Sequence, residues 1–66
     1  MHIWINEEPK EVKDGVTLQN LLDELGFDAA TVVVEMDGVI VARDAFAATT
    51  VSEGNRLELV RFVGGG

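Results

Sequence analysis

The sequence of 66 residues contains no cysteine and no tyrosine, and it has a single histidine and a single proline. Without cysteine, neither a disulfide framework nor a thiolate metal site is possible, and the sequence carries no mark of a redox compartment. No segment reaches the run of about 20 apolar residues that a membrane span needs. The first residues also lack the basic start and long apolar stretch of a signal peptide, so we expect a cytoplasmic protein.

Side chains that carry chemistry are also sparse. His2 is the only imidazole, and without a nearby nucleophile it is more typical of a strand surface than of a catalytic base. The acidic pairs at 7–8 and 23–24 are typical of a solvated turn and a solvated helix face, and no spaced set of donors marks a metal site. The internal glycines match no nucleotide-binding fingerprint. These features predict that the chain is not an enzyme and binds no metal or cofactor of its own.

The charge is strongly acidic, with twelve aspartates and glutamates against five lysines and arginines and a formal net charge of −7. This charge opposes binding to nucleic acid or to anionic lipid, and it favours approach to a basic protein surface. An acidic surface also keeps a small protein soluble, so the charge alone leaves both interpretations open. At 66 residues the chain has room for one domain with one small core, and its 47% hydrophobic residues argue against disorder.

The first part of the sequence predicts a β-hairpin. Residues 2–6 have the alternation of a strand, with Ile3 and Ile5 on one face. Residues 7–9 predict a polar turn whose proline ends the strand pairing, and residues 10–13 predict the returning strand. We therefore expect the second strand to begin after the proline.

A short amphipathic helix is predicted between Thr17, a suitable N-cap, and Gly26, which suits a left-handed C-terminal cap. Its apolar residues recur at i, i+3, i+4 and i+7, and they are Leu18, Leu21, Leu22 and Leu25. Burying this leucine stripe contributes roughly 6–12 kcal/mol, at ~1.5–3 kcal/mol for each side chain. The helix is therefore expected to be the main cover of the core.

The second half predicts another hairpin and a short helical turn. Residues 32–36 are rich enough in β-branched side chains for a largely buried strand, and the Asp-Gly pair that follows predicts a tight turn into residues 39–41. Residues 43–48 predict a helical turn that carries Phe46 inward. Residues 49–51 predict one more brief strand.

Residues 56–63 predict the last strand, with Leu57 and Leu59 on the face toward the helix. A single leucine stripe needs a single sheet face, so we expect an α+β fold in which one main helix packs across a mixed sheet of four or five strands. If the first and last strands are neighbours at the centre, they run parallel through a crossover that contains the helix. The predicted domain spans residues 1–63, and residues 64–66 are predicted to be a flexible tail.

Three consecutive glycines, Gly64, Gly65 and Gly66, follow the last strand. Without side chains they fit a slot too narrow for other residues, and fully extended they reach roughly 10 Å. This pattern suggests that the terminal carboxylate works inside the active site of another protein. Frayed termini and linkers are also rich in glycine, so the tail alone leaves a structural explanation open.

The alternation along the strands also predicts a docking surface. Trp4, Val60 and Phe62 share the outer face of two neighbouring strands that lead into the tail. Aromatic and aliphatic side chains beside a reactive terminus predict contact with a partner protein. The alternative is that loops or a second copy of the chain cover them.

Four stretches of the sequence, together with its length and order, resemble one family. They are MHIWIN at 1–6, GVTLQNLL at 15–22, VEMDGVIVAR at 34–43 and EGNRLELVRFVGGG at 53–66. The chain resembles the ThiS-type sulfur carriers of thiamin biosynthesis, which have the ubiquitin-like β-grasp fold. Two departures are visible, because Asn55 stands where the family usually has aspartate and Ala42 where a proline is common. They leave open a related branch, such as the molybdopterin-type carriers.

The resemblance implies a function for the tail. In this family an E1-like adenylating enzyme uses ATP and magnesium to convert the terminal carboxylate into an acyl-adenylate, and a sulfur donor such as a cysteine desulfurase supplies the sulfur of a thiocarboxylate. Gly66 would carry that sulfur, while Gly64 and Gly65 would thread the active site of the partner. The sulfur would then pass to a thiazole synthase, and the carrier itself would catalyse nothing.

Other functions fit the same tail. A related carrier would deliver sulfur to molybdopterin or to another metabolite, and a ubiquitin-like modifier would be conjugated through Gly66 to lysines of target proteins. A plain interaction module would not need the tail. A carrier would gain sulfur at its terminus, whereas a modifier would appear as an isopeptide adduct on larger proteins.

Overall fold

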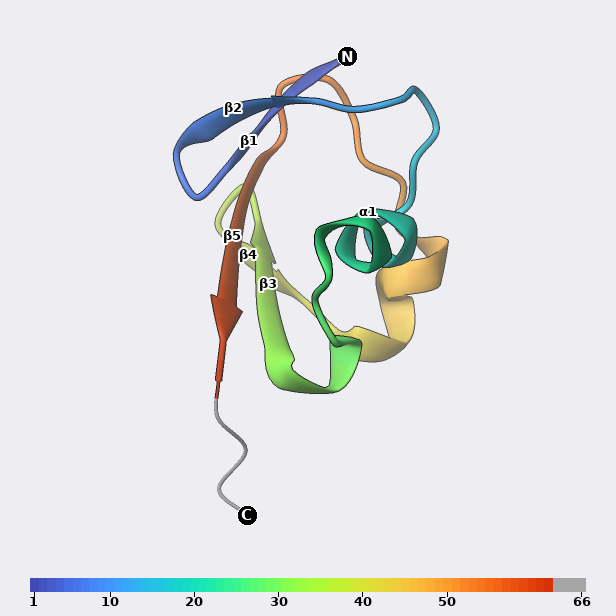
Figure 1. Ribbon diagram of the computed structural model, residues 1–66, viewed down its shortest axis with the longest axis vertical. Helices are drawn as coiled ribbons and strands as arrows, with labels where there is room; N and C mark the ends of the chain where they lie inside the picture. Colours follow the sequence, from blue (N-terminus) through green and yellow to red (C-terminus); the bar gives the residue numbers. More distant parts are fainter. Residues whose placement is uncertain (63–66) are drawn as a thin grey trace.

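The strands of the computed structural model form one mixed sheet, and the structure describes residues 1–62 of the chain (Figure 1). In chain order the elements are β1 (His2–Ile5), β2 (Glu8–Glu11), α1 (Leu18–Leu25), the 3-10 helix η1 (Ala29–Thr31), β3 (Val32–Met36), β4 (Val39–Val41), the 3-10 helix η2 (Arg43–Ala48) and β5 (Arg56–Arg61). The 5-stranded sheet has the order β2-β1-β5-β3-β4. One main helix on a mixed sheet confirms the predicted α+β β-grasp fold.

β1 and β5 lie side by side at the centre of the sheet. They run parallel, with Trp4 beside Arg56 and Ile5 beside Leu57, whereas the other neighbouring strands are antiparallel. The crossover between β1 and β5 contains α1, as the sequence predicted. Figure 1 shows α1 and η2 on the same side of the sheet, so that within residues 1–62 the other face carries no helix.

α1 begins and ends at the residues that the sequence predicted. The Thr17 side chain accepts a hydrogen bond from the backbone N–H of Asn20 at 3.2 Å, and Gly26 closes the helix in the left-handed conformation at φ 80°. The fully buried residues of the helix are Leu18, Leu21 and Leu22. Leu25 packs at the edge of the same core, so the leucine stripe faces the sheet.

The core lies between α1, η2 and the inner face of the sheet. Its largest fully buried side chains are Phe46, Ile3, Leu18, Leu21, Leu22, Leu57, Val34 and Val51. η2 carries Phe46 inward as predicted, and 1% of this residue is exposed. Leu57 and Leu59 are both buried, which confirms the predicted inner face of β5. None of the helices within residues 1–62 is long and apolar enough to cross a membrane.

The first hairpin differs from the prediction. Its turn is formed by Asn6 and Glu7, with φ of 50° and 68°, and β2 includes Pro9 instead of starting after it. Pro9 pairs with Trp4, and Trp4 donates its N–H to the Asn55 carbonyl at 2.9 Å on the other side of β1. Because Trp4 turns its backbone polar groups away from edge strand β2, the missing N–H of proline leaves no hydrogen bond unmade.

The predicted strand at residues 49–51 does not form. Thr50 makes only an isolated bridge to Thr17, and the backbone N–H of Leu18 donates to the Thr49 carbonyl at 2.9 Å. The segment therefore pairs with the residues that enter α1. Because α1 begins directly after Thr17, the partner of Thr50 is not followed by extended residues, and strand pairing cannot continue beyond this single bridge.

β3 and β4 occupy the predicted residues, and their Asp-Gly turn has φ of 51° and 85°. β5 is shorter than predicted, because it ends at Arg61. Phe62 still donates its N–H to the Thr31 carbonyl at 2.9 Å, so the chain continues alongside the residue that precedes β3. Residue 63, the predicted last residue of the strand, lies outside the described residues.

Candidate functional site

The predicted sulfur-carrying residue, Gly66, and the predicted threading residues, Gly64 and Gly65, lie outside the described residues. The structure does describe the strand that leads to them. β5 lies between β1 and β3, and its last residue, Arg61, pairs with Val32 of β3. The candidate site is therefore built from β5 and the strands beside it.

Asn6 holds the middle of β5 at the point where β1 turns away. Its backbone N–H donates to the Leu57 carbonyl at 2.8 Å. Its side-chain oxygen accepts from the Leu59 N–H at 2.8 Å, and its side-chain nitrogen donates to the Leu59 carbonyl at 3.3 Å. An amide side chain offers both a donor and an acceptor, so Asn6 extends the pairing of β5 beyond the end of β1. Sequence reasoning missed this role, because Glu7 stands where a tight hairpin turn usually has glycine.

The end of β5 is held from the inner face by an aromatic contact. The guanidinium carbon of Arg61 lies 4.6 Å from the centroid of the Phe27 ring, which is a cation–π distance. Phe27 follows the C-terminal cap of α1 and packs against the core. The last strand residue is therefore fixed to the helical layer as well as to β3.

The outer face of β5 exposes apolar side chains, as the docking hypothesis requires. Val60 is 57% exposed and Phe62 is 44% exposed. The structure adds two residues that sequence reasoning missed, namely Val33, which lies opposite Val60 and is 38% exposed, and Ile40, which is 67% exposed. Strand alternation assigns both to the outer face, but only the pairing of β3 with β5 brings Val33 to Val60.

Trp4 lies at the other end of this face. It pairs with Arg56, whose guanidinium carbon is 5.1 Å from the Trp4 ring centroid, and it is half-buried. Val60 is four residues further along β5, or about 13 Å at the rise of an extended strand. The structure therefore groups Val60 with Phe62 but does not bring Trp4 to them, and the docking roles of all three stay predictions.

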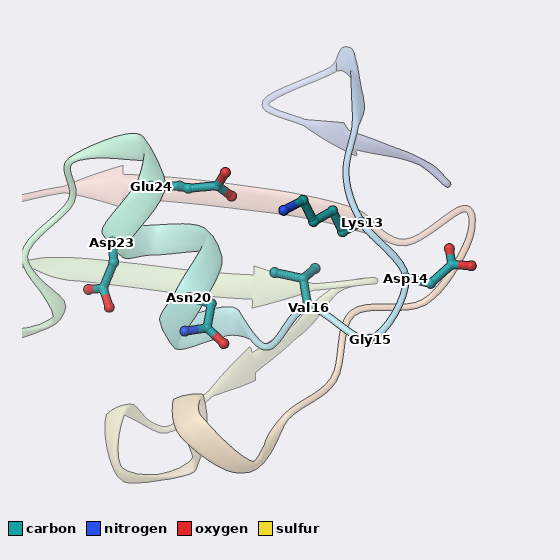
Figure 2. Close-up of a pocket in the computed structure, with 7 residues that line it drawn as sticks. All are labelled: Lys13, Asp14, Gly15, Val16, Asn20, Asp23 and Glu24. Carbon is teal, nitrogen blue, oxygen red and sulfur yellow. The ribbon is translucent and has the colours of Figure 1, made fainter.

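A hollow of about 520 Å³ opens beside the N-terminal end of α1. It is lined by Lys13, Asp14, Gly15, Val16, Asn20, Asp23 and Glu24. Figure 2 shows the carboxylates of Asp14, Asp23 and Glu24 pointing in three different directions. Within residues 1–62, no three histidine, aspartate or glutamate side chains are grouped so that they hold a metal ion. The described residues of the hollow thus lack the converging donors that hold a metal ion.

The N-terminal ammonium group ties the start of β1 to the end of β2. It donates to Oε2 of Glu11 and to the Val12 carbonyl, each at 2.8 Å. Nε2 of His2 lies 2.7 Å from the other carboxylate oxygen of Glu11. The hydrogen bond with Glu11 raises the pKa of the Met1 amine, and the same bond lowers the pKa of Glu11. These charges stabilise the hairpin at the end of the sheet away from Phe62.

Comparison with known proteins gives two relatives of much greater length. Proteins named thiazole synthase from Magnetococcus marinus and Paramagnetospirillum magneticum are each 39% identical to this chain over 66 residues. The similarity covers 100% of this chain but 20% of each relative. The chain thus spans one fifth of the length of these two proteins.

A solved structure matches over the full length. The crystal structure of the thiamine biosynthesis protein ThiS from Geobacter metallireducens has 36% sequence identity and a TM-score of 0.86, and 100% of both chains is covered. The sequence model of the ThiS family matches residues 3–66 of this chain. Because sequence, strand order and length all agree with one family over nearly every residue, this chain belongs to the ThiS family.

Proposed function

We propose that this chain is a sulfur carrier whose Gly66 carboxylate is activated by a partner enzyme, converted to a thiocarboxylate and used as the sulfur source for thiazole formation in thiamin biosynthesis. The observation that carries the proposal is the family match, which extends through residue 66 and so includes the glycine tail. The fold adds a β5 strand that is held by contacts of Asn6 and Arg61, and the backbone of Phe62 directly after it is bonded to Thr31.

The chemistry explains why a carrier needs partners. A carboxylate is a poor electrophile, so an adenylating enzyme first joins its oxygen to the α-phosphorus of ATP, with magnesium bound and pyrophosphate leaving. A persulfide sulfur donor, such as that of a cysteine desulfurase, then attacks the acyl carbon and AMP leaves. A thiol finally cleaves the resulting acyl disulfide, which releases the thiocarboxylate and forms a disulfide. The positive groups for the phosphates belong to the enzyme.

The proposed sulfur acceptor is a thiazole synthase. Two relatives that bear this name contain a segment similar to this chain within one longer protein. Joining two modules in one chain keeps them at high effective concentration, which favours transfer between them. This arrangement supports a direct encounter between the carrier and the synthase.

The test is the intact mass of the chain after incubation with the adenylating enzyme and the persulfide-loaded sulfur donor of the same organism, ATP, magnesium and a thiol that cleaves the acyl disulfide. We expect a mass increase that corresponds to one oxygen replaced by sulfur, and its loss when ATP is omitted. A variant that lacks Gly65 and Gly66 is the matched control and should stay unchanged. An unchanged mass of the wild-type chain would overturn the proposal, and isopeptide adducts on larger proteins would favour a protein modifier instead.

A further inference from the structure

β5 continues beyond the strand that pairs with it on one side. Its pairing with β1 covers only Arg56 and Leu57, because β1 ends at Ile5. On the other side, β5 stays paired with β3 from Leu57 to Arg61. Within residues 1–62, the last part of β5 therefore has a neighbouring strand on one side only. It is also the part of the strand that leads to the glycine tail.

The side chain of Asn6 takes the place of a strand on the side where β1 has ended. Its oxygen accepts from the Leu59 N–H at 2.8 Å, and its nitrogen donates to the Leu59 carbonyl at 3.3 Å. One amide thus bonds both backbone polar groups of one residue, and only asparagine and glutamine side chains offer such a group. A contact through two parallel bonds fixes orientation as well as position. Asn6 therefore sets the direction in which β5 leaves the sheet.

The backbone of Asn6 has a conformation that would suit glycine. Its φ is 50°, in the left-handed region, where glycine has no steric cost and asparagine is tolerated better than most residues. A glycine would form the turn equally well, but it would have no side chain to reach Leu59. The turn alone therefore does not explain an amide at this position, whereas the contact with β5 does.

The direction of β5 at Leu59 has a large effect on the position of the terminal carboxylate. Residues 60–66 follow Leu59, and a fully extended chain of this length spans up to roughly 23 Å. A change of about 10° in direction at its start would move its far end by roughly 4 Å. Reaction rates in active sites are sensitive to displacements of about 1 Å, which can cost about a hundredfold.

We propose that Asn6 is a positioning residue for the activation of Gly66, because it directs β5, and the residues after it, toward the active site of the adenylating enzyme. This inference rests on the proposed function, in which the Gly66 carboxylate is the group that is adenylated. Asn6 acts through Leu59 and not through contact with ATP. Its loss lowers the fraction of bound carriers whose carboxylate reaches ATP, so kcat should fall while the affinity for the enzyme is kept.

The test compares two variants of the full-length chain. Asn6→Gly removes the amide and keeps a residue that suits φ 50°, so the domain stays folded. Thr17→Ala is the matched control, because it removes the N-cap hydrogen bond of α1 and leaves the contacts of β5 intact. Exchange of labelled pyrophosphate into ATP by the adenylating enzyme of the same organism gives kcat and KM for each carrier, and titration calorimetry gives the affinity.

We expect kcat with Asn6→Gly to be about tenfold below that of wild type, with affinity within about twofold, and we expect both values for Thr17→Ala within about twofold. Deuterium exchange at the Leu59 amide should be faster in Asn6→Gly than in the control. Asn6→Asp keeps the acceptor for the Leu59 N–H and should recover part of kcat. A role confined to stability would move neither kcat at saturating carrier nor this partial recovery.

Three results would overturn the positioning role. The first is a kcat with Asn6→Gly equal to that of Thr17→Ala, which would leave the sulfur-carrier function standing. The second is a loss of affinity with unchanged kcat, which would make Asn6 a docking contact. The third is an enzyme that is active on another carrier but gives no pyrophosphate exchange with the wild-type chain, in which case the proposed function fails as well.

Discussion

The two faces of the sheet differ in how fully folding explains them. On the inner face, Ile3, Val34 and Leu57 are all buried in one core beneath the helical layer. On the outer face, Ile40 and Val60 are exposed, and the like-charged residues Glu35 and Glu58 lie directly opposite each other across β3 and β5. A face selected only for solubility and stability would carry mixed charges without apolar neighbours. The inner face therefore specifies the fold, and the outer face reflects a requirement other than folding.

The largest effect should come from the helix that covers the inner face. Leu22→Ala removes a fully buried side chain and should lower the free energy of unfolding by about 2–5 kcal/mol, enough to unfold much of a domain this small. Val60→Ala, on the outer face, should change it by less than about 0.5 kcal/mol. Urea unfolding followed by circular dichroism compares the two. Equal costs would show that the contrast between the faces is wrong.

A smaller effect is expected at Asn6, whose side chain continues the hydrogen bonding to β5 after β1 has ended. Asn6→Ala removes both hydrogen bonds to Leu59 and should cost about 1–3 kcal/mol, at about 0.5–1.5 kcal/mol for each bond. Hydrogen exchange at the Leu59 amide should become faster. Asn6→Asp keeps the acceptor and loses the donor, so its cost should be intermediate. An aspartate variant as unstable as the alanine variant would show that the acceptor adds nothing.

The turn beside Asn6 offers a gain in stability. Glu7 has φ 68°, a conformation that glycine adopts without the steric cost of a side chain. Glu7→Gly should therefore raise the free energy of unfolding by about 1 kcal/mol. Glu8→Gly is the matched control, because Glu8 lies in β2 and has no positive φ, and it should destabilise the domain. A glycine at 7 that also destabilised it would show that the side chain of Glu7 makes a favourable contact.

Features that depend on residues near one another in the sequence were predicted correctly, whereas features that depend on contacts between distant residues were not. Thr17 and Gly26 cap α1 through hydrogen bonds within a few residues, so their roles are readable from the sequence. The prediction that Pro9 ends the strand pairing was wrong. A proline fits within β2 because β2 is an edge strand and because its partner Trp4 donates its N–H to the other side of β1, and neither fact is visible in the sequence. The meeting of Glu35 with Glu58 depends on the register of two strands far apart in sequence. The alternation along a strand predicts the sheet face on which a side chain lies, but it does not predict which side chains of the other strands lie beside it.

The smallest effect concerns the exposed charges at the start of β1, which belong to neither face. The pKa of Glu11 is lowered from 4.5 mainly by its hydrogen bond with the Met1 amine, so its contribution is present above pH 4.5 and is lost as the pH falls through the lowered value. The pKa of the Met1 amine is raised from 8.0 mainly by the same bond, so its contribution is complete below pH 8.0 and is lost as the pH rises through the raised value.

The contribution of this ion pair to stability should therefore be greatest between pH 4.5 and 8.0. The measurement is the difference in urea midpoint between wild type and Glu11→Gln across the acid, neutral and alkaline ranges. Titrating groups that do not contact Glu11 are common to both chains and cancel in this difference, whereas His2, whose Nε2 lies 2.7 Å from Glu11, contributes to it when protonated. A difference that stayed constant across all three ranges would show that the hairpin does not depend on the charge of either group. The hairpin would then be held by backbone pairing between β1 and β2 and by the bond from the Met1 amine to the Val12 carbonyl. In that case its stability, like that of the inner face, would not depend on charged groups.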